Sequence, residues 1–148
     1  TYGDDIDAVV SENDEMALGA REAIEAQNMD IPCIGIDGIT DAVAAVDDKD
    51  VQILDVRDDD TYKAGHLKGS FQCGLKEIES ADAQTAMYKL ATEKMDSSKK
   101  VYLLCYSGNK CAKTGISILK DAGFDLDNLY IIENGAKDGD VSAAFVTE

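Results

Sequence analysis

The segment that most constrains the fold is a short apolar run that meets a helix-forming run across a tight loop. Residues Val101–Leu104 are continuously apolar, which is typical of a buried strand in a parallel sheet. From Asn109 to Lys120 apolar residues recur at helical spacing, and Gly123 marks a stop. The loop between them, Cys105-Tyr-Ser-Gly-Asn-Lys110, therefore joins the carboxyl end of a strand to the amino end of a helix.

This loop is suited to holding an anion at the Cys105 sulfur. A strand–loop–helix aims backbone N–H groups and the positive end of the helix dipole at one point. The loop therefore favours the thiolate form of Cys105, and Lys110 adds a cation nearby. The alternative is a structural cysteine buried at a strand end, because free cysteines are common in protein cores.

Two enzyme families place a cysteine at the head of such a loop. Tyrosine phosphatases require Cys-x5-Arg, but the residue six positions after Cys105 is Cys111, so phosphate lacks its bidentate partner. Rhodaneses, which transfer sulfur, use a loop one residue tighter, Cys-x4-Arg or Lys. The segment Cys105–Lys110 fits that pattern. The tighter ring suits a persulfide sulfur better than a tetrahedral phosphate.

The composition of the 148 residues excludes several classes of partner. With 45% hydrophobic residues the chain can bury a core, and a net charge of −16 argues against nucleic acid or an anionic membrane. The four cysteines lack zinc-type spacing and there is one histidine, so we predict no metal site and no cofactor. We also predict no membrane span, because no segment is long and apolar enough.

The first part of the chain predicts a βαβ unit. Residues 7–10 and 33–36 are predicted strands, and apolar residues at helical spacing predict a helix between 14 and 28. A right-handed crossover is expected between the two parallel strands.

This unit carries a resemblance of its own. The segments Asp5–Ala20 and Ile34–Gly38 resemble the carboxyl-terminal lobe of periplasmic sugar-binding proteins of the ribose-binding type. The resemblance implies that Asn13 and Asp37 stand where that family hydrogen-bonds sugar hydroxyls. A sugar cleft needs two lobes, however, and this chain holds part of one.

From residue 39 onward the chain predicts alternating helices and strands. This alternation indicates an α/β fold with a parallel sheet that helices cover on both faces. The acidic run Asp58–Asp60 can cap the helix that follows, and it is interpreted as the solvated start of that helix. The predicted helices are 40–46, 61–64, 75–95 and 109–120, the strands are 51–57, 70–73, 101–104 and 129–132, and 141–146 is a terminal helix or extension.

Four motifs occur in order along this part of the chain: Leu54-Asp-Val-Arg57, Ala64-Gly-His-Leu-Lys-Gly69, Cys105-Tyr-Ser-Gly-Asn-Lys110 and Glu133-Asn-Gly135. Together they resemble a single-domain rhodanese over residues 39–148. Residues 1–38 are then a βαβ fragment that precedes a rhodanese-like domain. The resemblance implies a sulfurtransferase that moves sulfane sulfur from an anionic donor such as thiosulfate to a thiol or cyanide, through a persulfide on one cysteine.

The resemblance also implies roles for individual residues. Cys105 is the expected nucleophile, and Lys110 is the expected cation for an anionic donor. Arg57 is expected to contact substrate or to form a structural salt bridge, and the turn at His66 is expected to be structural. The expected N–H cradle is Tyr106, Ser107, Gly108, Asn109 and Lys110.

The chain departs from the family pattern at three positions. Lys110 stands where the family often has Arg, and it lacks the bidentate fork. Thr61 replaces the usual Glu, so the ion pair of Arg57 is expected to be missing or moved. Cys111 is either a small core residue or a thiol that resolves the Cys105 persulfide as a disulfide.

Two other functions stay open at this point: a catalytically idle rhodanese-like interaction module, and a remnant of a solute-binding protein. The N-terminal fragment cannot bury its strands alone, so it must extend the sheet, form a homodimer by exchange with a second chain, or pack on a partner. Sugar-binding ancestry would place the protein outside the cytoplasm, and otherwise a cytoplasmic location is expected.

Overall fold

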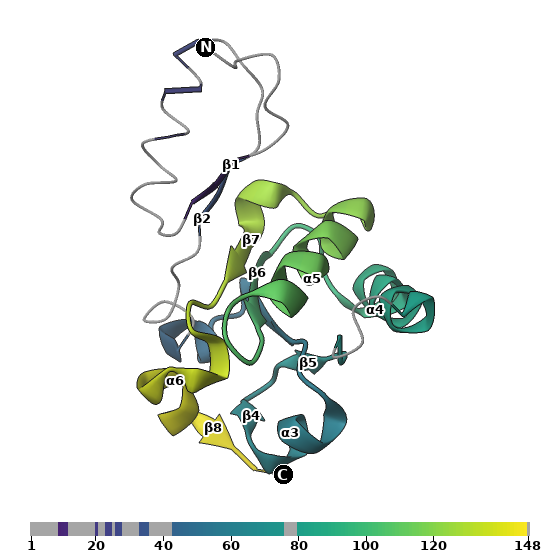
Figure 1. Cartoon of the computed structure of the whole chain (residues 1–148), viewed down its shortest axis with the longest axis vertical. Helices are drawn as coiled ribbons and strands as arrows, with labels where there is room; N and C mark the ends of the chain where they lie inside the picture. Colours follow the sequence, from purple (N-terminus) through teal and green to yellow (C-terminus); the bar gives the residue numbers. More distant parts are fainter. Residues whose placement is uncertain are drawn as a thin grey trace.

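A parallel sheet forms the centre of the protein (Figure 1). The computed structural model describes residues 9–11, 20, 23–24, 26–27, 33–35, 43–75 and 80–147. The strands lie in the order β5 (Phe71–Gln72), β3 (Val51–Asp55), β6 (Lys100–Leu104) and β7 (Leu129–Ile131). Every neighbouring pair is parallel, so the carboxyl ends of the strands share one edge, where open α/β sheets place their sites.

Side chains alternate between the two faces of the sheet along β6. Val101, Leu103 and Cys105 belong to one apolar cluster, and Tyr102 and Leu104 belong to the other. This period of two explains the continuous apolar run in the sequence, because both faces of the strand are covered.

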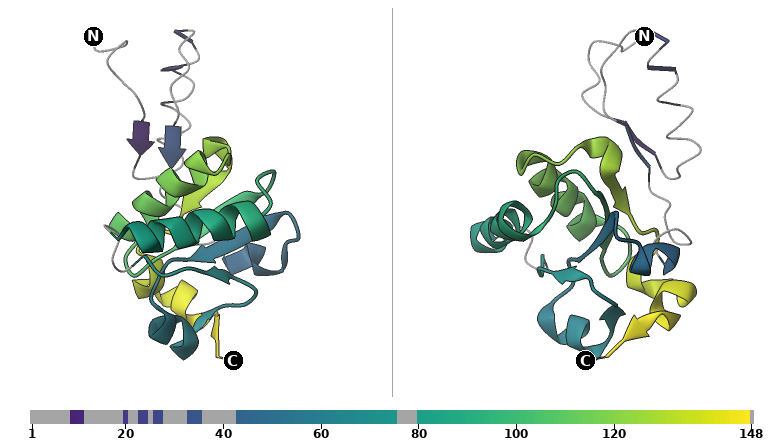
Figure 2. Two further views of the ribbon diagram at one scale, coloured as in Figure 1. Left: turned by 90° about the vertical axis from the view of Figure 1, so that its right-hand side faces the viewer. Right: turned by 180° about the vertical axis from the view of Figure 1, so that it is seen from behind.

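Helices cover one face, and shorter elements cover the other. The helices α4 (Ala81–Lys94) and α5 (Lys110–Asp121) lie together on the first face, as Figure 2 shows. The second face is covered by α6 (Gly139–Ala143) and by the turn of 3-10 helix η2 (Ala45–Asp47). This two-sided cover confirms the predicted α/β fold.

The carboxyl-terminal strand pairs with a short strand that follows β3 in the chain. Beyond β3 lie α3 (Asp59–Ala64) and β4 (His66–Leu67). The last strand, β8 (Phe145–Val146), pairs antiparallel with β4. Two further turns of 3-10 helix flank β7: η3 (Leu126–Asn128) and η4 (Gly135–Lys137).

The N-terminal strands form a separate pair. β1 (Val9–Ser11) and β2 (Cys33–Gly35) are parallel, as predicted, and Ala20, Ala23 and Ile24 between them are helical. β2 lies near β7 and η3. The boundary between an N-terminal fragment and a domain from residue 39 stays a prediction.

One predicted helix begins later than expected. The helix predicted from residue 75 begins at Ala81, where Ser80 caps it by accepting the Ala83 N–H at 3.4 Å. Leu75 is instead outside any helix and donates its N–H to the Val56 carbonyl at 2.9 Å. Residues 76–79 lie outside the described part.

Candidate active site

Cys105 lies directly after β6, at the edge where the carboxyl ends of the strands meet. It is 2% exposed. The Asn109 N–H donates to the Cys105 Sγ at 3.3 Å. A backbone donor at the sulfur stabilises a sulfur anion, and this amide is one donor of the predicted cradle. A contribution of the other loop amides stays a prediction.

Two glycines allow the loop to pack against the turn that follows β7. Gly108 has φ 62°, and a Cβ atom there would lie 2.7 Å from the Ile132 carbonyl oxygen. Gly135 has φ 54°, and its Cβ would lie 2.2 Å from the Cys105 carbonyl oxygen. Both positions therefore need glycine. The same carbonyl accepts the Ala136 N–H at 2.8 Å, which ties the loop to the turn.

The helix α5 begins at the end of this loop. Its first residue, Lys110, is exposed, and so are Ser107 and Asn109. Asn109 precedes the helix without a side-chain capping bond, so the amide end of α5 is open toward an anion. The structure thus places the amino terminus of α5 beside Cys105, and an action of the Lys110 charge on an anion there stays a prediction.

Arg57 is part of the scaffold around the site. It is 2% exposed, and its Nη2 lies 2.6 Å from Asp55 Oδ2, while its Nε also donates to Asp55. Nη2 donates to the Gly65 carbonyl at 2.7 Å, and the guanidinium lies 4.7 Å from the Phe145 ring centroid. The structural salt bridge is confirmed, and its partner has moved to Asp55. Contact of Arg57 with a substrate stays a prediction.

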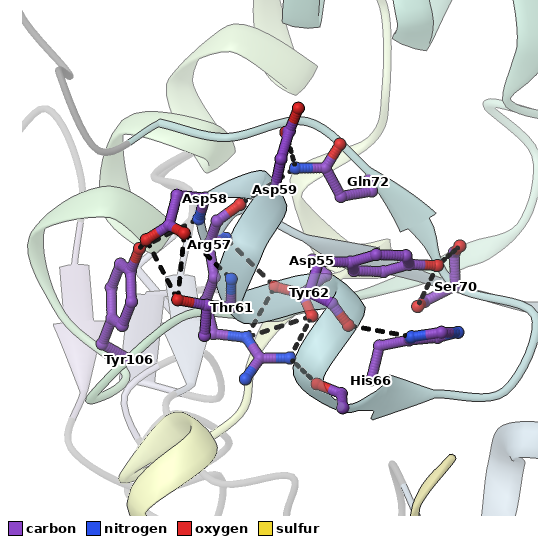
Figure 3. Close-up of polar contacts among 11 residues, drawn as sticks. Asp55, Arg57, Asp58, Asp59, Thr61, Tyr62, His66, Ser70, Gln72 and Tyr106 are labelled. Carbon is purple, nitrogen blue, oxygen red and sulfur yellow. Dashed lines mark hydrogen bonds and ion pairs between the residues drawn. The ribbon is translucent and has the colours of Figure 1, made fainter. Parts of the chain in front are cut away.

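A hydrogen-bond network links the loop to the start of α3 (Figure 3). The Tyr106 hydroxyl donates to the Asp58 carboxylate, and its oxygen accepts the Asp58 N–H at 2.9 Å. The carboxylate also accepts the N–H of Thr61 at 2.9 Å and its hydroxyl at 3.0 Å. Burial, and then the hydrogen bond to Asp58, raise the pKa of Tyr106.

The sequence indicated that this acidic run can cap the helix, but the run was interpreted as solvated, and the contact of Asp58 with Tyr106 was not predicted. Asp59 and Asp60 are exposed, but Asp58 is the N-cap of α3 and the partner of Tyr106. The available signal was local: an Asp three residues before a Thr at a helix start is typical of a cap. The contact with Tyr106, 48 positions away, had no such signal.

His66 supports the turn rather than the sulfur. It is 2% exposed, its Nδ1 lies 3.0 Å from the Tyr62 carbonyl oxygen, and its ring stacks on Tyr62 with centroids 4.0 Å apart. The predicted structural role of this turn is confirmed.

Two further thiols lie at the margin of the same core. Cys73 and Cys111 are half-buried free cysteines that pack against the cluster containing Cys105. Burial, followed by the influence of Cys105, raises the pKa of Cys111. Burial, followed by the charge of Asp59, raises the pKa of Cys73. This packing agrees with Cys111 as a small core residue.

Three further predictions concern the sugar-binding residues, a metal site and a membrane span. Asn13 and Asp37 lie outside the described residues. In the described part of the chain, no group of three His, Cys, Asp or Glu residues could hold a metal ion. No helix among the described residues is long and apolar enough to cross a membrane.

A family model for the rhodanese-like domain matches residues 39–139. Solved structures share the fold. A rhodanese-related protein from Thermoplasma volcanium is 20% identical, with 74% of this chain and 95% of that chain covered and a TM-score of 0.52. A protein from Bacillus halodurans is 16% identical, with 80% and 76% covered and a TM-score of 0.55.

The N-terminal part matches a different group. The ribose import binding protein RbsB of Bacillus subtilis is 56% identical over 45 residues, which is 30% of this chain and 15% of that protein. A xylitol-binding protein of Mycolicibacterium smegmatis is 49% identical over 47 residues, 31% of this chain and 14% of that protein. The chain therefore spans a small fraction of these curated relatives.

Proposed function

The chain belongs to the rhodanese-like domain family, and from this premise we propose that it is a sulfurtransferase that carries sulfane sulfur on Cys105. The observation that supports this most is the Asn109 N–H at 3.3 Å from the Cys105 sulfur, at the start of α5. A thiolate needs such donors to form, and the persulfide that it becomes needs them as well.

The proposed reaction has two displacements. The Cys105 thiolate attacks the outer sulfur of thiosulfate, the sulfur–sulfur bond of thiosulfate breaks, and sulfite leaves with the bonding electrons. A cyanide or thiolate acceptor then attacks the outer sulfur of the persulfide, which regenerates the Cys105 thiolate and gives thiocyanate or a new persulfide. Each step conserves charge and needs no cofactor or metal.

A thiosulfate–cyanide assay, together with the intact mass of the protein after thiosulfate treatment, tests this proposal. Turnover and one added sulfur on Cys105 are expected. Absence of both, in a folded protein, would contradict the proposal and favour the idle interaction module. The near-complete burial of Cys105, at 2% exposure, is the observation that keeps this second candidate open.

The remnant of a sugar site is tested separately. The relatives matched by the N-terminal part bear names that refer to ribose and xylitol. Calorimetric titration with each sugar measures whether this chain retains any affinity.

A homodimer through the N-terminal fragment is also proposed, and sedimentation of the full chain measures its mass.

Lys110 is expected to attract the anionic donor. The Lys110→Ala variant should raise the KM for thiosulfate about two- to fivefold and change the KM for a neutral persulfide donor less, because an exposed charge contributes modestly. Added salt should reduce the difference between wild type and variant. The matched control is Lys113→Ala, an exposed lysine one turn further along α5. Equal changes for both donors would show that Lys110 does not act on the anion.

Cys111 is the proposed resolving thiol. Its sulfur would attack the inner sulfur of the Cys105 persulfide, form a Cys105–Cys111 disulfide and expel hydrosulfide. Peptide mapping of the sulfur-loaded protein, wild type against Cys111→Ser, measures this link. If the persulfide decays at the same rate in both proteins, Cys111 is a core residue, in agreement with its burial and raised pKa.

A further inference from the structure

Asp58 is held in place by contacts that do not involve Tyr106. Its backbone is extended at the start of α3, and both of its carboxylate oxygens accept hydrogen bonds from Thr61. A carboxylate held by several donors keeps one orientation, because a rotation would break them together. Asp58 is therefore a fixed point on the scaffold, outside the loop of Cys105.

Tyr106 is the loop residue that reaches this fixed point. Its phenol oxygen accepts from the Asp58 backbone and its hydroxyl donates to the Asp58 side chain, so two bonds fix the ring (Figure 3). The side chains of Ser107, Asn109 and Lys110, in contrast, are exposed to solvent. Tyr106 is thus the partly buried anchor between Cys105 and the start of α5.

The position of this anchor matters for the direction of the loop amides. Cys105 is held at its carbonyl by the Ala136 N–H at 2.8 Å, and Tyr106 follows directly. Beyond Cys105 and Tyr106 the chain turns at Gly108, and the Asn109 N–H lies 3.3 Å from the sulfur. A loop held at fewer points would present its donors to the sulfur only part of the time.

We propose that Tyr106 and Asp58 are positioning residues for sulfur transfer: their two hydrogen bonds hold the loop so that the Asn109 N–H faces the Cys105 sulfur. The inference rests on the proposed function for its catalytic consequence. Neither residue needs to touch the sulfur donor for this role, which separates the pair from Lys110.

Four variants separate positioning from general stability. Tyr106→Phe removes the hydroxyl alone. Asp58→Ala removes the carboxylate, whereas Asp58→Asn keeps one acceptor oxygen, which serves either the Tyr106 hydroxyl or the Thr61 N–H because these two donate to different oxygens of the carboxylate. The matched control is Tyr62→Phe, because the Tyr62 hydroxyl bonds to Ser70 instead: it donates to the Ser70 carbonyl at 2.9 Å and accepts from the Ser70 hydroxyl at 3.3 Å.

The expected kinetic result is a change in kcat with little change in KM. In Tyr106→Phe and Asp58→Ala, kcat for the thiosulfate–cyanide reaction should fall about tenfold, the effect of one charge-assisted hydrogen bond, while KM stays within about twofold. The fall in kcat should be smaller for Asp58→Asn than for Asp58→Ala. Tyr62→Phe should match the wild type, and equal kcat in Tyr106→Phe and Tyr62→Phe would overturn the inference.

A second measurement does not depend on the proposed function. Iodoacetamide alkylates the Cys105 sulfur with loss of iodide, and peptide mapping gives the rate at this residue at a fixed pH. If the pair positions the Asn109 N–H, its loss leaves the attacking sulfur without a fixed donor, so Tyr106→Phe should be alkylated at Cys105 about tenfold more slowly than Tyr62→Phe. Equal alkylation rates would refute the positioning role. If the wild type carries no sulfur, the sulfurtransferase proposal fails, and alkylation still decides whether the pair positions the loop.

Discussion

Sulfur transfer by the Cys105→Ser variant is expected to fall at least about a thousandfold, to the level of the uncatalysed reaction. A serine hydroxyl is a poor nucleophile unless a base takes its proton, and the atom placed at this sulfur is an N–H donor. The chain's single histidine, His66, is bonded to the Tyr62 carbonyl instead. Thiocyanate formation and the intact mass after thiosulfate measure the loss.

The Cys73→Ser variant is the matched control, because Cys73 is a half-buried free thiol of the same core cluster. It should accept sulfur on Cys105 as the wild type does. Circular dichroism should show both variants folded, since each substitution exchanges a single side-chain atom and removes no carbon. Turnover above background in Cys105→Ser, with sulfur mapped to another cysteine, would show that the wrong nucleophile was chosen.

The largest expected effect on stability comes from Asp55→Ala, which should lower the free energy of unfolding by about 3–5 kcal/mol. The Arg57 guanidinium and the Asp55 carboxylate have side-chain exposures of 3% and 0%. Removal of the carboxylate leaves a buried cation whose remaining polar and ring contacts among the described residues are the Gly65 carbonyl and the Phe145 ring. It also removes the acceptor of the Arg57 N–H at 3.0 Å. Chemical denaturation measures the change.

An exposed ion pair of the same protein provides the comparison. Lys68 and Asp47 lie 3.0 Å apart, with side-chain exposures of 68% and 83%. Asp47→Ala should cost no more than about 1 kcal/mol. The double variant Asp55→Ala/Arg57→Met should recover much of the loss, because no buried charge is left unpaired. Equal destabilisation by Asp55→Ala and Asp47→Ala would show that the buried pair contributes no more than a surface pair.

The central part of the fold could be predicted from the sequence because its signals are local. The apolar run 101–104 and the helical spacing after Asn109 correspond to β6 and α5. The partner of Arg57 also had a local signal: Asp55, the last residue of β3, stands two positions before Arg57 in the same motif, and in extended chain such residues point to the same side. That signal was present in the motif and was not used.

Other features had no local signal. The terminal segment was predicted as a helix or an extension, and its last residues form β8 because β4, far away in sequence, offers a pairing edge. The bond between Asp58 and Tyr106 likewise depends on the parallel pairing of β3 with β6, which brings the two loops together. Spacing along the chain cannot reveal contacts that the sheet creates.

The tie between the Cys105 carbonyl and the Ala136 N–H has a consequence for the order of events during synthesis. A ribosome releases Cys105 well before Ala136, so the nascent chain first carries an ordinary thiol, without the turn that supports its loop. The support forms only after β7 has paired with β6, a contact that must wait for distant residues. Reactivity at Cys105 would then be delayed until the sheet is complete, so an unfinished chain would carry little of the chemistry of the finished protein.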